Sequence, residues 1–238
     1  MKIMTTINYA DTDIIHGLTE KHLTEISLND HLYKVTEDTG TAFLRMREDA
    51  LKDGINLCIA SSFRNFGRQK VIFEEKIAGI RPVLDRGEHP VNISELTPEE
   101  LIRTIMFFSA VPGMSRHHWG TDLDVYDPDA LADGEELDLT NRCYSKGCQK
   151  DVGTWLGENM HRYGFFRPYA LDNPYYSYEL WHISHYAEAD LFTGNLNPQE
   201  SIVFLREKAG LSLPDTVADI IEKEFNQRFR LFSHGRRK

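Results

Sequence analysis

Cysteines, long apolar runs and an excess of basic charge are all lacking in this sequence, and each absence excludes a class of protein. Cysteine occurs only 3 times in 238 residues, which excludes a small scaffold held together by disulfide bonds. No apolar run reaches the roughly 18 residues of a membrane-spanning helix. Basic residues number 27 against 37 acidic ones, and the net charge of −10 argues against a nucleic-acid-binding protein.

The N-terminus also lacks the pattern of a secretory signal peptide, because residues 1–11 become polar too early for an apolar core segment. The sequence as it stands therefore predicts a cytoplasmic location. A periplasmic or cell-envelope location is expected instead if an export signal has been removed.

The cysteines have ordinary explanations. Cys58 lies in an apolar run of strand length and is interpreted as a small buried hydrophobic residue. Cys143 and Cys148 lie close together in a loop-like segment. A second zinc site would need two more ligands with suitable spacing, and none is present. Between a local disulfide and two free thiols, the missing signal peptide favours free thiols.

The composition, 41% hydrophobic and 27% charged, is typical of a soluble globular protein. We divide the chain into an N-terminal extension (1–37), a central domain (38–189) with an insertion loop (127–150), and a helical C-terminal extension (190–238) that packs on the domain. Apolar periodicity and capping signals predict helices at about 38–53, 65–77, 97–109, 151–163, 197–210 and 214–232, and strands at 55–60, 121–126, from 165, and within 175–186.

The densest cluster of chemically active side chains is Ser115-Arg-His-His-Trp-Gly-Thr-Asp-Leu-Asp124. Histidine and carboxylate are the zinc ligands of choice where thiolates are absent. On a strand over 121–126, Asp122 and Asp124 point to one face. We therefore predict His117 and Asp124 as metal ligands, with Asp122 as the runner-up ligand or as a group that orients a ligand. His118 is interpreted as a hydrogen-bonded loop histidine, which is the commoner state of a single histidine.

A second cluster, Tyr178-Glu-Leu-Trp-His-Ile-Ser-His-Tyr186, supplies the remaining groups. If His182 joins the two ligands above on zinc, one position stays open for water, which is the pattern of a catalytic site. Glu179 is then the natural general base. On an ideal strand Glu179 and His182 face opposite ways, so a twist, bulge or loop is required between them. His185 would also face away from His182.

These two clusters resemble motifs of the zinc D-alanyl-D-alanine carboxypeptidase and dipeptidase family of the VanY and VanX type. The matching residues are Ser115, His117, Gly120 and Asp124 in the first cluster, and Glu179, Trp181 and His182 in the second. Two further stretches are similar in the same order: Ser61-Ser-Phe-Arg-Asn-Phe-Gly-Arg-Gln69 and Trp155-Leu-Gly-Glu-Asn-Met-His-Arg-Tyr-Gly-Phe165. The family usually has a small residue where this chain has Asp122, and Arg167-Pro-Tyr169 departs from the family's usual Tyr-Pro ending.

The resemblance implies an α+β fold, in which a small, mostly antiparallel sheet is flanked by helices. It also implies one catalytic zinc ion and the removal of a C-terminal D-amino acid from a peptidoglycan-type peptide. Arg64 is expected to stabilise the oxyanion or anchor the substrate, as a fixed guanidinium can. Substrate contacts are assigned to Ser115, Gln69, Trp181 and Ser62.

Several alternatives remain open at the level of sequence. The same chemistry serves L,D-carboxypeptidases, D,D-dipeptidases and lysins, and the residues do not distinguish these specificities. A zinc-binding interaction module without hydrolysis, as in the related hedgehog-type fold, is the alternative from a different class. The presence of both Glu179 and Arg64 argues against that module.

Overall fold

The centre of the molecule is a small antiparallel sheet. The structure is a computed structural model that describes residues 6–169, 171 and 173–230, so the expectations for residues 1–5 and 231–238 lie outside it. Every neighbouring pair of strands in the sheet is antiparallel, which confirms the expected α+β fold. The strands in spatial order are β3 (Cys58–Ser61), β4 (Asp122–Tyr126), β6 (His182–His185) and β5 (Phe165–Phe166).

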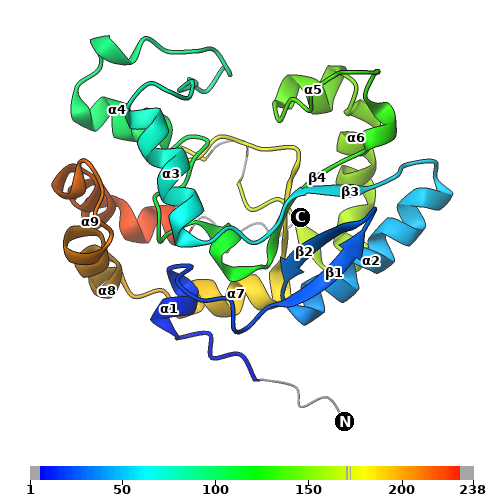
Figure 1. Cartoon of the computed structure of the whole chain (residues 1–238), viewed down its shortest axis with the longest axis horizontal. Helices are drawn as coiled ribbons and strands as arrows, with labels where there is room; N and C mark the ends of the chain where they lie inside the picture. Colours follow the sequence, from blue (N-terminus) through cyan, green and yellow to red (C-terminus); the bar gives the residue numbers. More distant parts are fainter. Residues whose placement is uncertain (1–5, 170, 172, 231–238) are drawn as a thin grey trace.

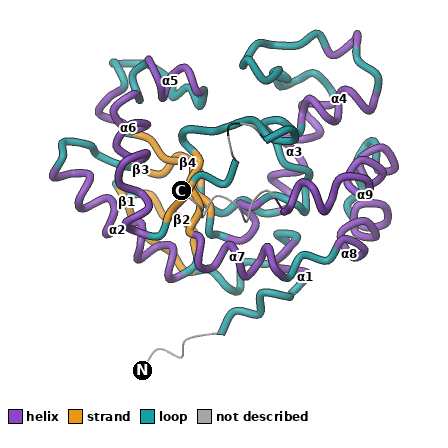
Figure 2. Tube along the Cα trace, turned by 180° about the vertical axis from the view of Figure 1, so that it is seen from behind, coloured by secondary structure: helices purple, strands orange, loops and turns teal. Residues whose placement is uncertain are grey.

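Helices lie on both sides of this sheet. In Figure 1, α2, α5 and α6 lie on one side of the strands and α3, α4, α8 and α9 on the other, and Figure 2 shows the same division from behind. The helices are α1 (Thr12–Ile15), α2 (Glu37–Lys52), α3 (Phe66–Ile77), α4 (Pro98–Ile105), α5 (Asn141–Lys146), α6 (Lys150–Asn159), α7 (Tyr186–Gly194), α8 (Pro198–Val203) and α9 (Pro214–Arg230).

Capping residues set the first residue of several of these helices, at the positions that the sequence predicts. Thr97 caps α4 and forms a reciprocal capping box with Glu100, and Pro98 occupies the first turn. The side chain of Asn65 accepts the backbone N–H of Arg68 and so begins α3. The predicted helices over 38–53, 65–77 and 97–109 are therefore confirmed, with ends that differ by a few residues.

The structure contains two features before the final strand that the sequence did not predict. The N-terminal extension contains a hairpin, β1 (Thr24–Leu28) and β2 (His31–Val35). Its turn residues Asn29 and Asp30 have positive φ values of 48° and 63°, which Asn and Asp tolerate better than most residues. This pair was the signal that sequence reasoning missed. The insertion loop contains α5, which begins at a side-chain cap from Thr140.

The final strand is shorter than predicted. It covers only His182–His185, whereas 175–181 approaches as a loop and α7 follows immediately at Tyr186. The run of aromatic residues before the strand gave it an extended pattern in the sequence. Those side chains pack into two hydrophobic cores and do not line one face of a sheet.

The first core lies against one face of the sheet. Strands β3, β4 and β6 contribute Ile59, Leu123, Val125 and Ile183 to it, all at most 1% exposed. Side chains from the hairpin, α2, α5 and α6 cover this face, so the N-terminal hairpin contributes directly to the core.

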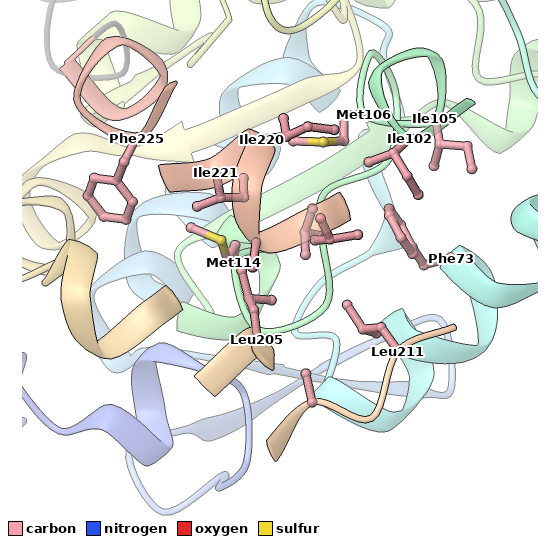
Figure 3. Packing of buried hydrophobic residues seen from close by; sticks show 14 of the residues in the cluster. Phe73, Ile102, Ile105, Met106, Met114, Leu205, Leu211, Ile220, Ile221 and Phe225 are labelled. Carbon is pink, nitrogen blue, oxygen red and sulfur yellow. The ribbon is translucent and has the colours of Figure 1, made fainter. Parts of the chain in front are cut away.

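The second core joins the C-terminal helices to the centre of the chain (Figure 3). Phe73 of α3 and Ile102 of α4 meet Ile221 and Phe225 of α9 in one cluster of buried side chains. The loop residue Met114, just before the His117 motif, belongs to the same cluster. Because α8 and α9 cover this part of the core, the last part of the chain supports the loop that carries the motif. No helix in the described part of the chain is both long and apolar enough to cross a membrane.

We expect Ile221→Ala to lower the free energy of unfolding by about 2–5 kcal/mol, because Ile221 is 1% exposed and truncation leaves a cavity. Unfolding in urea should remain a single transition, since α9 shares its core with α3 and α4. Leu191→Ala on α7, where the side chain is 47% exposed, is the matched control and should cost less than about 1 kcal/mol. Two separate transitions would show that α8 and α9 fold apart from the rest.

Candidate metal centre

Three predicted ligands converge at one end of the sheet. His117 lies on a short 3-10 turn, Arg116–Trp119, and Gly120 turns the chain into β4. Gly120 has a φ of 73°, and a Cβ atom there would lie 2.3 Å from Leu23, so only glycine fits. Asp124 of β4 and His182 of β6 are direct cross-strand partners in the antiparallel ladder. The sheet register therefore places two of the three side chains next to each other.

The distances suit a single small cation. One nitrogen of each histidine and a carboxylate oxygen of Asp124 all lie within 4.8 Å of one another. The Asp124 carboxylate is 3.4 Å from His117 Nε2 and 3.4 Å from His182 Nδ1. Asp124 Oδ1 is buried and accepts no hydrogen bond in the described structure, a state that normally carries a free-energy cost. A bound cation would satisfy this oxygen.

Each imidazole is oriented by a hydrogen bond from its other nitrogen. His117 Nδ1 lies 2.9 Å from the Ser62 carbonyl oxygen, which leaves Nε2 toward Asp124. His182 Nε2 lies 2.8 Å from Asp122 Oδ2, which leaves Nδ1 toward the centre. Metal-binding histidines usually donate their second N–H to such an oxygen. The two rings are thus turned with one nitrogen each toward the same point.

Asp122 lies behind His182 rather than among the converging atoms. Besides His182, it accepts hydrogen bonds from Arg116 Nε at 2.7 Å and from the Ser184 hydroxyl at 2.8 Å. Arg116 and Asp122 are 2% and 0% exposed, so this is a fully buried ion pair. Of the two roles predicted for Asp122, the geometry fits the orienting one. Sequence reasoning missed Arg116, although its position between Ser115 and His117 was the available signal.

Glu179 lies beside the centre without joining the ligand group. It precedes β6 in a loop, so the opposite-face problem of an ideal strand does not arise, and its Oε2 lies 3.2 Å from His182 Nδ1. Burial raises the pKa of Glu179, and the hydrogen bond from His182 only partly opposes this shift. A buried carboxylate with a raised pKa that lies this close to the candidate ligands suits proton transfer.

The two histidines differ in protonation in the metal-free protein. Burial lowers the pKa of His117, so its ring is neutral at pH 7. Burial acts in the same direction on His182, but hydrogen bonds to Asp122 and Glu179 and the charge of Asp124 outweigh it and raise its pKa to about 10. His182 therefore holds a proton that compensates the surrounding carboxylates.

Arg64 reaches the same centre from the junction of β3 and α3. Its guanidinium donates to Gln69 Oε1 and to the Ser61 hydroxyl, both at 2.9 Å, and lies 3.6 Å from Asp124 Oδ2. Gln69 in turn donates to the Ala110 carbonyl oxygen at 2.7 Å. These bonds fix the fork in one direction, as expected for a group that receives an anionic oxygen.

A small cavity of about 60 Å³ opens at the centre. This is room for about two waters at their share of liquid volume. Ser115, which we assigned to substrate contact, lines the cavity together with Arg64 and Glu179. Its walls also contain Tyr169, from the stretch that departs from the family's usual ending, and Tyr176, which sequence reasoning did not identify because it lies in a loop without a recognisable motif.

The other assigned substrate contacts do not line this cavity. Trp181 is 5% exposed and packs in the first core, with its ring centroid 5.8 Å from that of Tyr144. Gln69 contacts Arg64, and Ser62 contributes its backbone carbonyl to His117. In this geometry Gln69 and Ser62 act on the site through Arg64 and His117, and their direct contact with substrate stays a prediction.

His118, His185 and the cysteines lie outside the centre. His118 bridges two loops: its Nε2 accepts the Gly113 N–H at 3.0 Å and its Nδ1 lies 2.6 Å from the Arg64 carbonyl oxygen. His185 Nδ1 lies 3.3 Å from Glu188. Cys58 is buried, as predicted, and Cys143 and Cys148 are free thiols with sulfur atoms 3.3 Å apart.

Comparison with solved structures shows the same fold. VanYB in complex with D-alanine-D-alanine is 21% identical, with a TM-score of 0.51 over 76% of this chain and 88% of that chain. A mutant of the D,D-pentapeptidase VanY from a VanB-type resistance cassette, in complex with Zn(II), is 22% identical, with a TM-score of 0.50 over 75% of this chain and 88% of that one.

Comparison of sequences identifies the family that the motifs resemble. A D-alanyl-D-alanine carboxypeptidase of Enterococcus faecalis is 29% identical over 136 residues, which are 56% of this chain and 41% of that relative. This chain therefore matches less than half of the relative's length. The family model for VanY, D-alanyl-D-alanine carboxypeptidase, matches residues 32–188, well over half of the chain and including both motif clusters. The chain thus belongs to the VanY family of D-alanyl-D-alanine carboxypeptidases, which are peptidase hydrolases.

Proposed function

We propose that this protein is a zinc-dependent carboxypeptidase that removes a C-terminal D-amino acid from peptidoglycan-type peptides. The observation that carries the proposal is the convergence of His117, Asp124 and His182, with the Glu179 carboxylate 3.2 Å from His182. Membership of the VanY family and the D-alanine-D-alanine bound to the similar VanYB structure support the substrate class.

The donor set fits zinc. Two imidazoles and one carboxylate are the ligand types found in catalytic zinc sites, and they leave a coordination position for water. The unsatisfied buried oxygen of Asp124 and the fixed orientation of both rings support a cation at this point. The similar VanY structure in complex with Zn(II) points to the same metal. Bound zinc would polarise the scissile carbonyl and lower the pKa of a water molecule to about 7.

Residues of this chain would then carry out the proton transfer and stabilise the negative charge that develops on the substrate. Glu179 accepts the proton of the attacking water and delivers it to the leaving amine, because its burial favours the protonated intermediate state. Arg64 donates hydrogen bonds to the oxyanion that develops on the substrate carbonyl or holds the substrate's C-terminal carboxylate. Ser115, on the cavity wall, is placed to hydrogen-bond the same carboxylate.

We expect Glu179→Gln to lower kcat by about 10²–10⁴-fold while zinc binding is retained, because the variant loses the proton acceptor and no metal ligand. The assay uses one peptide ending in D-Ala-D-Ala, one ending in L-Lys-D-Ala, and free D-Ala-D-Ala, each with and without chelator. Cleavage of any of these that stops on chelation supports the proposal, and the cleaved peptide identifies the bond.

Wild-type activity in the Glu179→Gln variant would disprove the proposed mechanism. Bound zinc without cleavage of any peptide would favour the zinc-binding module over the hydrolase. A purified chain that binds no zinc after reconstitution would contradict the metal centre itself.

Zinc affinity should rise with pH. The proton on His182 competes with zinc for Nδ1, and with a pKa of about 10 the metal-free protein carries this proton at neutral pH. Zinc binding should therefore release about one proton, and the affinity should increase about tenfold per pH unit between about pH 7 and 9. Calorimetric titration in two buffers of different ionisation enthalpy measures the released protons.

The proton on His182 also affects the stability of the metal-free fold, and this effect decreases with pH whereas zinc affinity increases. A raised pKa stabilises the metal-free folded state fully below the unfolded pKa of about 6.5, and this stabilisation is lost as the pH rises through about 10.

Zinc affinity that does not change with pH between about pH 7 and 9 would show that His182 is not the protonated ligand.

Asp122 should tune the metal affinity through His182. Replacing Asp122 alone would leave the buried Arg116 charge without its carboxylate, so we expect the clearer result from the double variant Arg116→Met/Asp122→Ala. Zinc affinity should fall by about 10–100-fold, the usual effect of removing the partner of a metal-binding histidine. Ser184→Ala, which contacts Asp122 but not His182, is the control and should retain the affinity. Equal affinity in the double variant would contradict an orienting role for Asp122.

A further inference from the structure

The segment that carries Glu179 has to be fixed without a neighbouring strand. Residues 178–181 precede β6, so much of their backbone is bound by other parts of the chain. The Trp181 carbonyl oxygen accepts the Val125 N–H at 3.1 Å. The Leu180 carbonyl accepts from Arg167 Nε at 3.2 Å. The Tyr178 carbonyl oxygen and the Leu180 N–H, on either side of Glu179, both pair with Asn141, while the Glu179 carbonyl oxygen accepts the His182 N–H at 3.4 Å.

Asn141 brackets Glu179 on both sides. Its Nδ2 donates to the Tyr178 carbonyl oxygen at 2.6 Å, and its Oδ1 accepts the Leu180 N–H at 3.1 Å. A side-chain amide carries N–H donors and a carbonyl acceptor on one planar group, so it can pair with a backbone C=O and a backbone N–H at once. Asn141 therefore replaces the strand neighbour that this loop lacks, at the two backbone positions that flank the general base.

The support beneath Asn141 is rigid. Asn141 is the first residue of α5, and its backbone N–H donates to the Glu88 carboxylate at 2.5 Å. Tyr144, one turn later, donates its hydroxyl to the Val125 carbonyl oxygen of β4 at 2.8 Å. The same helix is thus bonded to the strand that carries Asp124. Through α5, the backbone of Glu179 is held in a constant relation to the metal centre.

This constraint matters because Glu179 has to remain near the centre without reaching it. Its Oε2 lies 3.2 Å from His182 Nδ1, so a small shift of the loop would change the distance between the carboxylate and the candidate ligands. A misplacement of about 1 Å in a catalytic group can cost about 100-fold in rate.

We propose that Asn141 is a positioning residue for Glu179. Asn141 does not line the cavity and touches neither the ligands nor the space for substrate. It acts by holding the two peptide groups beside the base. This inference rests on the proposed function, in which Glu179 is the proton acceptor.

Asn141→Ala is the first test, with Asn159→Ala as the matched control. Asn159 also donates one hydrogen bond, to the Trp155 carbonyl oxygen, and accepts one, from Arg162, but within its own segment. We expect Asn141→Ala to lower kcat by about 10–100-fold while KM, zinc affinity and the unfolding temperature of the zinc-loaded enzyme stay close to wild type. Asn159→Ala should leave kcat unchanged.

A double-mutant cycle separates positioning from a general structural role. In a Glu179→Asp background, where the carboxylate is already misplaced and some activity remains, Asn141→Ala should add little further loss. Multiplicative losses would show that Asn141 acts elsewhere. Wild-type kcat in Asn141→Ala, or a loss of zinc affinity equal to the loss of kcat, would also overturn the inference. If Asn141→Ala fails to fold, Asn141→Ser gives the same comparison with a smaller change. An inactive wild-type enzyme would instead refute the proposed function.

Discussion

The pairing of Asp124 with His182 across β4 and β6 is the constraint on which the site depends. A slip of one strand by one residue would turn its side chain to the opposite face and separate Asp124 from His182. The strands hold their register because Leu123, Val125 and Ile183 alternate with the polar residues and are completely buried in the first core. The same alternation that forms the core therefore brings the candidate ligands Asp124 and His182 together.

Buried charge is the second constraint, because Asp122, Asp124 and Glu179 are all removed from water. Carboxylates so close together destabilise the folded state unless cations or hydrogen-bond donors compensate them. Arg116 compensates Asp122, Arg64 and His117 face Asp124, and the proton on His182 serves the whole group. Zinc would take the place of that proton, so metal binding and proton release are parts of one electrostatic balance.

Elements distant in sequence hold this centre in place. The second core connects α9 to the loop before His117 through Met114, and α5 connects the Glu179 segment to β4 through Asn141 and Tyr144. Neither α5 nor α9 contributes a ligand. Their side chains instead restrict the two loops that carry His117 and Glu179, which would otherwise be the least constrained parts of the site.

The sequence by itself pointed to the residues of the proposed site, because His117, Asp124, Glu179 and His182 stand in dense local motifs that can be recognised without knowledge of the fold. It also determined most helices, since caps such as Thr97 and Asn65 act within one turn. Only the tertiary structure shows where Asp122, Arg116, Trp181 and Asn141 lie relative to that site. These positions depend on contacts between segments far apart in the chain. Asn141 and Tyr178, for example, are in contact although they are separated by 37 positions in the sequence, and local periodicity carries no information about such contacts.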